Sequence, residues 1–287
     1  MLNKNIETIL GCDAEYEDAS TVLFGAPFDS TTSYRPGTRF GSSAIRHESF
    51  GMETYSPYQD KDMTDYAFFD SGDIELCIGS SQLALEAIEE RARTILADGK
   101  RPFMLGGEHL VTLGAFRAAA EKYPDIHIVH FDAHADLRED YLDVKLSHAC
   151  VIRRCWEIIG DGKIFQFGIR SGDRDEFLWG KDHVETHRFT LDTLEETVAR
   201  LGDVPVYLTV DLDVLDPSVF PGTGTPEPGG VSFDELRRAV TLVCSRAHMV
   251  GCDVNELSPP YDPSGISTAA ACKIVREMLL ALPQSRG

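Results

Sequence analysis

The sequence has little positive charge, no paired cysteines and no long apolar run. Its 287 residues carry 27 Lys and Arg against 47 Asp and Glu, a formal net charge of −20. Because a nucleic-acid-binding protein needs a basic surface for the phosphate backbone, this balance argues against a nucleic-acid partner. An acidic field could instead attract a small cationic substrate, although solubility alone explains the charge equally well.

The seven cysteines are scattered and none forms a C-x-x-C pair. The sequence therefore predicts neither a disulfide framework nor a zinc knuckle. No apolar run approaches the roughly 18 residues that span a bilayer, and the N-terminal segment lacks the apolar core of a signal peptide. We therefore expect a cytoplasmic protein with no membrane partner.

Short apolar segments alternate with amphipathic helical patterns along the chain. Strands are predicted at residues 21–28, 66–74, 101–107, 126–132, 163–169, 206–213 and 249–257, with a weaker candidate at 183–189. Strands that alternate with helices indicate an α/β fold, in which a mostly parallel sheet is covered on both faces. The sequence has no linker, internal repeat or low-complexity segment, so residues 1–287 are expected to form one domain.

Two helices have clear signatures. A helix over residues 80–98 is predicted from an apolar stripe formed by Leu83, Ala84, Ala87, Ile88, Ala92 and Ile95. A second helix should begin after Ser232, which with Glu235 makes a capping box.

Residues 131–138, FDAHADLR, follow an apolar strand and place Asp132, His134 and Asp136 in alternation with alanines. In an extended chain every second side chain points to the same side, so the three polar groups would face one way. A single Asp or His at such a position is usually just exposed to solvent. Three alternating ligands separated by alanine are poor turn material, so the stretch predicts a metal site.

Ligands of parallel α/β sheets bind beyond the carboxyl ends of the strands, and polar residues follow three other predicted strands. His109 follows one strand, Asp211 and Asp213 end another, and Glu256 ends a third. Taken singly, each has a structural explanation, such as a loop histidine or an exposed D-x-D pair. Together they suggest one cluster at a common edge.

Two histidines and four aspartates suit borderline-to-hard divalent ions such as Mn²⁺ better than a thiolate-bound zinc. Six ligands exceed what one ion needs when a position for water must stay open. A pair of ions would use all six, and four carboxylates would balance their charge.

Five ordered motifs resemble the ureohydrolases, the arginase–agmatinase family: GGEH (106–109), FDAHADLR (131–138), Ser147-His148, DLDVLDPSVFPGTGTPEPGG (211–230) and DVNELSPPYD (253–262). Segments 25–46 and 136–154 are most similar to the bacterial and archaeal agmatinase branch, and the resemblance extends from about residue 20 to the C-terminus. It implies an arginase-like, three-layer α/β/α sandwich with about eight strands. It also implies a homo-oligomer, usually a trimer or hexamer.

The resemblance further implies hydrolysis of a guanidinium to urea at a pair of Mn²⁺ ions. One ion would be held by His109, Asp132, Asp136 and Asp211, and the second by Asp132, His134, Asp211 and Asp213. A hydroxide between the ions would attack the guanidinium carbon. Glu256 would pair with the guanidinium, and His148 would move a proton to the leaving amine. Glu256 could instead brace its loop, and His148 could be a packing residue.

The substrate is indicated by fewer residues. Where arginases carry an asparagine, two residues after the D-x-H-x-D stretch, this chain has Arg138, which favours agmatine over arginine. Arg138 could read a carboxylate on a substrate such as guanidinobutyrate. It could equally be held as structure by one of the acidic residues Glu139, Asp140 and Asp143. Asn255 stands where the family more often has an apolar residue, and we expect it near the site.

Three alternatives to an agmatinase therefore remain open. One is another guanidino-compound amidinohydrolase, such as a guanidinobutyrase, in which Arg138 recognises the substrate. Another is a non-enzymatic metal-binding sensor that keeps the site without the activity. The third is metal-assisted hydrolysis of a different substrate, because the metal chemistry does not fix the leaving group.

Overall fold

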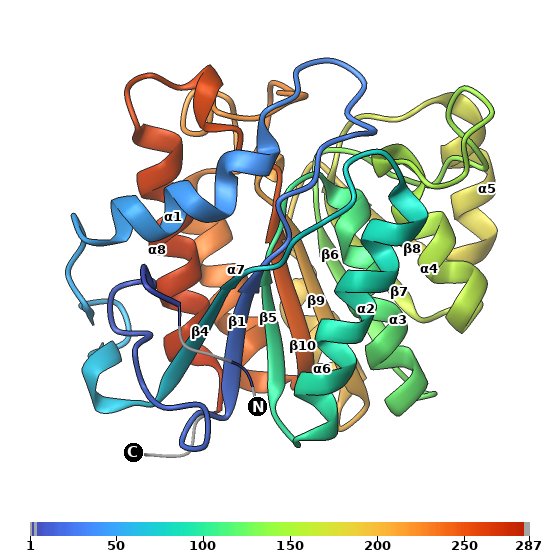
Figure 1. Ribbon diagram of the computed structural model, residues 1–287. Helices are drawn as coiled ribbons and strands as arrows, with labels where there is room; N and C mark the ends of the chain where they lie inside the picture. The colour runs from blue at the N-terminus through green and yellow to red at the C-terminus, as the bar shows by residue number, and fades with distance from the viewer. Residues whose placement is uncertain (1, 3–4, 284–287) are drawn as a thin grey trace.

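The computed structural model describes residue 2 and residues 5–283. Within them, the main sheet has eight parallel strands in the order β4-β1-β5-β10-β9-β6-β7-β8 (Figure 1). The strands are β1 Thr21–Gly25, β4 Phe68–Asp73, β5 Arg101–Leu105, β6 His127–Phe131, β7 Ile164–Ile169, β8 Glu185–Arg188, β9 Pro205–Asp211 and β10 His248–Asn255. All eight were predicted from the sequence, and the parallel α/β architecture is confirmed.

Helices cover both faces of this sheet. The α-helices are α1 Gly41–Ser49, α2 Ser81–Ala97, α3 Thr112–Lys122, α4 Val151–Ile159, α5 Arg174–His183, α6 Leu194–Leu201, α7 Phe233–Arg246 and α8 Ile266–Ala281. Single 3₁₀ turns are η1 Thr38–Phe40, η2 Met63–Asp65, η3 His109–Val111, η4 His148–Cys150, η5 Leu212–Val214 and η6 Pro259–Tyr261. A small antiparallel hairpin joins β2 Tyr55–Ser56 to β3 Lys61–Asp62.

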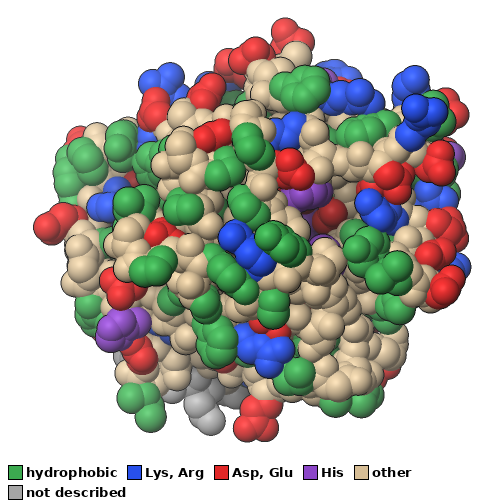
Figure 2. All heavy atoms as spheres, turned by 90° about the horizontal axis from the view of Figure 1, so that it is seen from above, with side chains coloured by type: hydrophobic (Ala, Val, Ile, Leu, Met, Phe, Trp, Pro, Cys, Tyr) green, Lys and Arg blue, Asp and Glu red, His purple; other side chains and the backbone are tan. Residues whose placement is uncertain are grey.

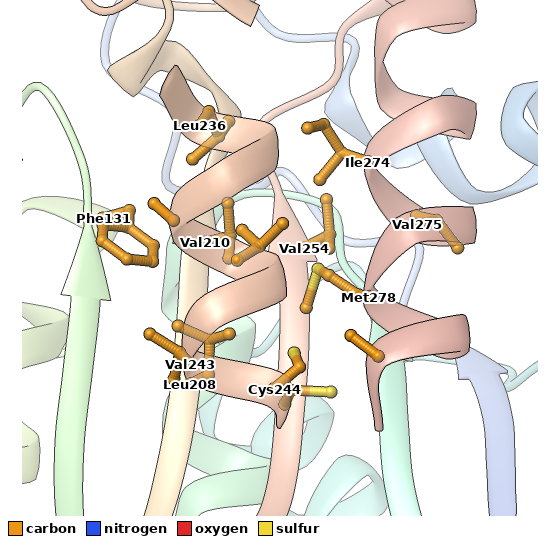
Figure 3. Close-up of a cluster of buried hydrophobic side chains, with 14 of the residues drawn as sticks. Phe131, Leu208, Val210, Leu236, Val243, Cys244, Val254, Ile274, Val275 and Met278 are labelled. Carbon is orange, nitrogen blue, oxygen red and sulfur yellow. The ribbon is translucent and has the colours of Figure 1, made fainter. Parts of the chain in front are cut away.

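The core is split into two hydrophobic clusters, one on each face of the sheet. Successive strand residues face opposite sides, so Leu23 of β1 joins the cluster of α1, α6, α7 and α8, while Val22 and Phe24 join that of α2, α3 and α4. Figure 3 shows part of the first cluster, in which strand side chains such as Val210 and Val254 pack against α7 and α8. Each large apolar side chain buried in this way contributes about 1.5–3 kcal/mol.

The two predicted helix signatures had different outcomes. The capping box before α7 is confirmed, because Ser232 Oγ accepts a hydrogen bond from the backbone N–H of Glu235 and the Glu235 carboxylate accepts one from that of Ser232. The predicted stripe of α2 was wrong at Leu83, which is 52% exposed, whereas Leu85 and Leu96 are buried. The buried face is therefore rotated slightly from the predicted one.

The carboxyl ends of β5, β10, β9 and β6 lie next to one another in the middle of the sheet, at the upper edge in Figure 1. Segments far apart in the sequence therefore meet there. Among the described residues, none of the helices has the length and apolar character that crossing a membrane requires.

Candidate metal centre

The six residues predicted as metal ligands lie together at this carboxyl edge. They follow or end β5 (His109), β6 (Asp132, His134 and Asp136) and β9 (Asp211 and Asp213). Five of the six are buried, and only the side chain of His134 is partly exposed, at 23%. Figure 2 looks onto this edge of the molecule and shows histidine and carboxylate side chains in a recess.

The ring of His109 faces three of the carboxylates. Its Nδ1 lies 2.9 Å from Oδ2 of Asp136, 3.1 Å from Oδ2 of Asp132 and 3.5 Å from Oδ2 of Asp211. On the opposite side of the ring, Nε2 is 2.9 Å from the hydroxyl of Thr209. Because the threonine occupies Nε2, it is Nδ1 that the ring presents to the carboxylates.

A second group forms around His134. Its Nδ1 lies 3.0 Å from Oδ2 of Asp213 and 3.4 Å from Oδ1 of Asp132. The metal-binding atoms of Asp132, His134 and Asp213 all lie within 4.8 Å of one another. Asp132 thus contacts both histidines, the position that a residue shared by two ions needs.

The local geometry behind this convergence differs from the predicted one. Strand β6 ends at Phe131, so strand alternation does not carry the chain as far as Asp136. Asp136 has a positive φ of 53°, and this turn brings its carboxylate back to His109. The prediction that the groups meet is confirmed, but the continuous extended conformation behind it was wrong.

The four carboxylates have no Lys or Arg partner within residue 2 and residues 5–283. Among the described residues, their ion pairs are to histidine and never to Lys or Arg. Burial, followed by the charge of Asp132, raises the pKa of Asp136 to about 7. Burial and the charge of Asp213 likewise raise the pKa of Asp211 well above its usual range. Ionised carboxylates so close together need added positive charge, so the donor set fits divalent cations.

Glu256 lines a cavity of about 280 Å³ beside the predicted metal ligands. It follows β10 with a positive φ of 66°, and its Oε1 accepts a hydrogen bond of 2.7 Å from the backbone N–H of His109. This hydrogen bond ties the loop of Glu256 to the turn that carries His109, which is the structural role that the sequence left open for Glu256. Burial, with the charges of Asp213 and Glu108, raises the pKa of Glu256 well above its usual range. A cationic ligand beside the carboxylate would relieve this destabilisation.

His148 also lines the cavity, at the start of η4. Its backbone N–H donates to Thr31 Oγ1 over 3.0 Å, and its Nε2 lies 3.2 Å from Ser33 Oγ. Burial, followed by the nearby His134, lowers the pKa of His148 to about 4. The imidazole is therefore neutral near pH 7 and can accept a proton.

A sequence model of the arginase family matches residues 19–281. The chain belongs to the arginase family. An agmatinase from Bacillus subtilis (strain 168) is 48% identical over 269 residues, which cover 93% of this chain and 93% of the relative. A guanidinobutyrase from Pseudomonas aeruginosa is 33% identical, with 94% of this chain and 88% of that protein covered. The crystal structure of a protein from Clostridium difficile superposes on this chain with a TM-score of 0.91 and 52% sequence identity. The match covers 93% of this chain and 98% of that one.

The family predicted from the motifs is thus confirmed, and the clustered His and Asp side chains form an arginase-family metal site. Sequence reasoning missed Glu108, which lies beside His109 in this site. Its buried carboxylate accepts hydrogen bonds from the backbone and hydroxyl of Thr31 and from the hydroxyl of Thr32. Glu108 therefore anchors the loop that carries Thr31 to His148. The acidic residue inside GGEH was the available signal.

Sequence reasoning also missed His130, which stands two residues before Asp132 and continues the same alternation. It is fully buried, and its Nε2 lies 2.8 Å from Oδ2 of Asp132. A buried strand histidine looks like a core residue in the sequence, and only its partner identifies it as part of the site.

Arg138 lines the cavity but has partners other than those considered from the sequence. Its Nε lies 3.3 Å from Glu176 and 3.7 Å from Asp173, at the start of α5, and its guanidinium stacks on Tyr141 at 5.0 Å. Glu139 instead pairs with Lys145 and Arg153. Arg138 thus has carboxylate partners that are distant in sequence, and these ion pairs support a structural role for it.

Asn255 lies near the site, as predicted, yet its amide does not contact Glu256 among the described hydrogen bonds. Its Nδ2 donates to Asp253 Oδ1 over 2.6 Å and to Thr112 Oγ1 over 3.1 Å, and it lies 3.4 Å from Thr209 Oγ1. Because Thr209 holds the ring of His109, Asn255 supports that histidine.

Proposed function

We propose that this arginase-family protein hydrolyses agmatine to putrescine and urea with the help of two Mn²⁺ ions. The observation that carries the proposal is the position of Asp132 between two His/Asp groups, beside a cavity that Glu256 also lines. The 48% identity to a Bacillus subtilis agmatinase over 93% of both chains supports the substrate.

In this proposal Asp132 and Asp211 would be shared by the two ions. His109 and Asp136 would complete one ligand set, and His134 and Asp213 would complete the other. When bound, a pair of divalent cations lowers the pKa of water enough to supply a nucleophile near neutral pH.

The chain's own groups bind the substrate and move the proton. The carboxylate of Glu256 pairs with the guanidinium, whose N–H groups match two carboxylate oxygens. Nε2 of His148 takes up the proton that the attacking water releases and passes it to the leaving amine. Burial lowers the pKa of this imidazole to about 4, which keeps the ring neutral for that role. The hydroxyl of Ser33 lies 3.2 Å from Nε2 of that ring, and the hydroxyl of Thr31 accepts a hydrogen bond from the backbone N–H of His148.

A guanidinobutyrase activity is the second candidate, because Arg138 lines the cavity and a relative with that activity is 33% identical. An arginine that reads a substrate carboxylate needs an unpaired charge. Here two carboxylates, Glu176 and Asp173, already face its guanidinium. This pairing favours a substrate without a carboxylate.

The test is urea release by Mn²⁺-loaded protein from agmatine, arginine and 4-guanidinobutyrate, measured side by side. Turnover of agmatine alone is the expected result. Turnover of guanidinobutyrate alone would give Arg138 a recognition role and replace the proposed substrate. Urea from none of the three, with metal shown to be bound, would favour the non-enzymatic sensor.

We also propose that the chain forms one catalytic domain and assembles as a trimer or hexamer. A single eight-stranded sheet carries residues from Thr21 to Asn255, which supports one domain over the described part of the chain. Residues 1, 3–4 and 284–287 of the predicted domain lie outside the described residues. The oligomeric state follows from the family resemblance, and sedimentation of the purified protein measures it.

A further inference from the structure

His130 is a buried histidine at the metal centre to which the proposed mechanism gives no role. It lies on β6, it is fully buried, and its Nε2 and the metal-binding atoms of His109 and Asp132 lie close together. Two roles are conceivable for it: it is a further metal ligand, or it positions Asp132. The proton on its ring decides between them.

The amide of Gln166 on β7 fixes that proton. Its Nε2 lies 2.7 Å from the backbone carbonyl of Ala135 and 3.1 Å from Nδ1 of His130. A carbonyl can only accept, so the amide nitrogen rather than the amide oxygen must face Ala135. This amide nitrogen can only donate, and therefore Nδ1 of His130 accepts and carries no proton.

The neutral ring then carries its proton on Nε2, which donates to Oδ2 of Asp132 over 2.8 Å. Neither nitrogen of His130 has a free lone pair to bind a metal ion. The donor–acceptor direction continues outward, because the hydroxyl of Thr186 on β8 donates to Oε1 of Gln166 over 2.9 Å. Thr186, Gln166 and His130, on three adjacent strands, thus form one directed chain of hydrogen bonds that ends on Asp132, a predicted metal ligand.

We propose that Gln166 positions the whole metal-binding segment. It acts on Asp132 through His130, and it contacts the carbonyl of Ala135 directly. Ala135 lies between His134 and Asp136, so one amide group holds both ends of the segment that supplies three predicted ligands. Hydrogen-bond partners that orient metal ligands typically change metal affinity by about 10- to 100-fold when they are removed. Gln166 and His130 are positioning residues, because neither faces the substrate cavity.

The inference depends on the proposed metal site, and it is tested by Mn²⁺ binding as well as by turnover. Gln166→Leu removes both donated hydrogen bonds and the one accepted from Thr186, at nearly constant volume. His130→Phe removes the donor to Asp132, whereas His130→Gln keeps an amide N–H close to the position of Nε2. His127→Gln, on the same strand and away from the centre, is the matched control. Mn²⁺ affinity is measured by equilibrium dialysis, with circular dichroism and the unfolding midpoint as checks on folding.

We expect Gln166→Leu and His130→Phe to weaken Mn²⁺ binding by about 10- to 100-fold. At saturating Mn²⁺ the KM for agmatine should match the wild-type value. His130→Gln should recover most of the affinity, and His127→Gln should behave as wild type. Unchanged Mn²⁺ affinity in Gln166→Leu, or equal losses in His130→Gln and His130→Phe, would overturn the proposal.

A second measurement covers variants that fail to fold. In metal-free wild-type protein labelled with ¹⁵N-histidine, the ring of His130 should show the neutral form with its proton on Nε2. A proton on Nδ1 would refute the directed chain. If the wild type binds Mn²⁺ and the variants rank as expected, yet no guanidino compound releases urea, the positioning role stands and the proposed function fails.

Discussion

Two groups of buried carboxylates in the molecule have different partners. On α8, Glu277 is fully buried beside Arg276, whose guanidinium donates to Glu277 Oε1 over 2.7 and 3.0 Å. The other oxygen of Glu277 accepts from Ser56 and Gln59, which lie on and beside the β2–β3 hairpin. At the metal centre the ion-pair partners of the four aspartates are all histidines among the described residues.

The difference separates a structural ion pair from a functional site. Where the chain supplies its own arginine, the charge is balanced on folding and the pair fastens a hairpin to a helix. Where four aspartates pair only with histidines over the described part of the chain, the cluster fits bound divalent cations. A cluster of buried carboxylates without a Lys or Arg partner is therefore a candidate for a functional site.

The largest expected effect is at the shared ligand. Asp132→Ala should lower urea release below roughly one thousandth of the wild-type rate, because two ions lose a common ligand. Metal analysis should show less than the wild-type content of Mn²⁺. Full activity in this variant would contradict the bridging role.

Glu256 tests binding chemistry without disturbing the metals. Glu256→Gln should keep both ions and lose turnover by roughly 100-fold, since a hydrogen bond to a charged partner contributes about 1.5–3 kcal/mol. Steady-state kinetics with parallel metal analysis measure the change. Wild-type kinetics would place guanidinium recognition on another residue.

Disrupting the ion pair between Arg276 and Glu277 should lower the stability of the protein and leave its metal content unchanged. Glu277→Leu leaves Arg276 buried without its partner and should lower the free energy of unfolding by about 3–5 kcal/mol. The control is Glu121→Gln, which breaks an exposed pair with Arg93 and should cost less than about 1 kcal/mol. Denaturant unfolding compares the two, and equal losses would remove the distinction drawn between buried and exposed pairs.

In the metal-free protein, repulsion among the buried carboxylates should make the stability depend on pH. Burial and neighbouring charge raise the folded-state pKa of Asp136 to about 7 and that of Asp211 well above its usual range. Between the unfolded-state pKa near 4 and these values, the folded protein holds protons that the unfolded chain releases. Stability of the metal-free protein should therefore fall as the pH rises from about 4 to 7. Mn²⁺ should remove this slope in thermal unfolding curves, and a slope unaffected by metal would argue against binding at these groups.

The smallest effect is expected at Arg138. Because it is partly exposed and pairs with Glu176 and Asp173, Arg138→Met should change agmatine turnover by less than roughly threefold. Urea release from agmatine and from 4-guanidinobutyrate should be measured together. Selective loss of the second activity would identify Arg138 as a carboxylate reader.

The parts of the molecule that follow from local patterns could be predicted from the sequence. Apolar runs bounded by polar residues identified the eight strands, and polar residues at their ends identified the metal cluster. The Ser232 capping box is likewise a short-range feature. These features depend on residues within a few positions of one another.

Features that depend on packing could not be predicted in this way. Leu83 was wrongly predicted to be buried, because apolar residues lie on more than one face of α2. Tertiary packing determines which of these faces is buried. For a structural role of Arg138 only the neighbouring acids were considered, whereas its carboxylate partners follow β7. His130 was overlooked because its role is defined by Gln166, a residue on the adjacent strand.

The position of β10 has a consequence for how the protein matures. This strand is the last of the sheet in sequence, yet it lies between β5 and β9 in the middle. As the chain leaves the ribosome, the sheet stays divided into two separate halves until residues 248–255 emerge and join them. Glu256 reaches its place beside His109 only at that step. A nascent chain stalled before β10 therefore carries all six predicted metal ligands but lacks the strand that joins β5 to β9 and the carboxylate of Glu256.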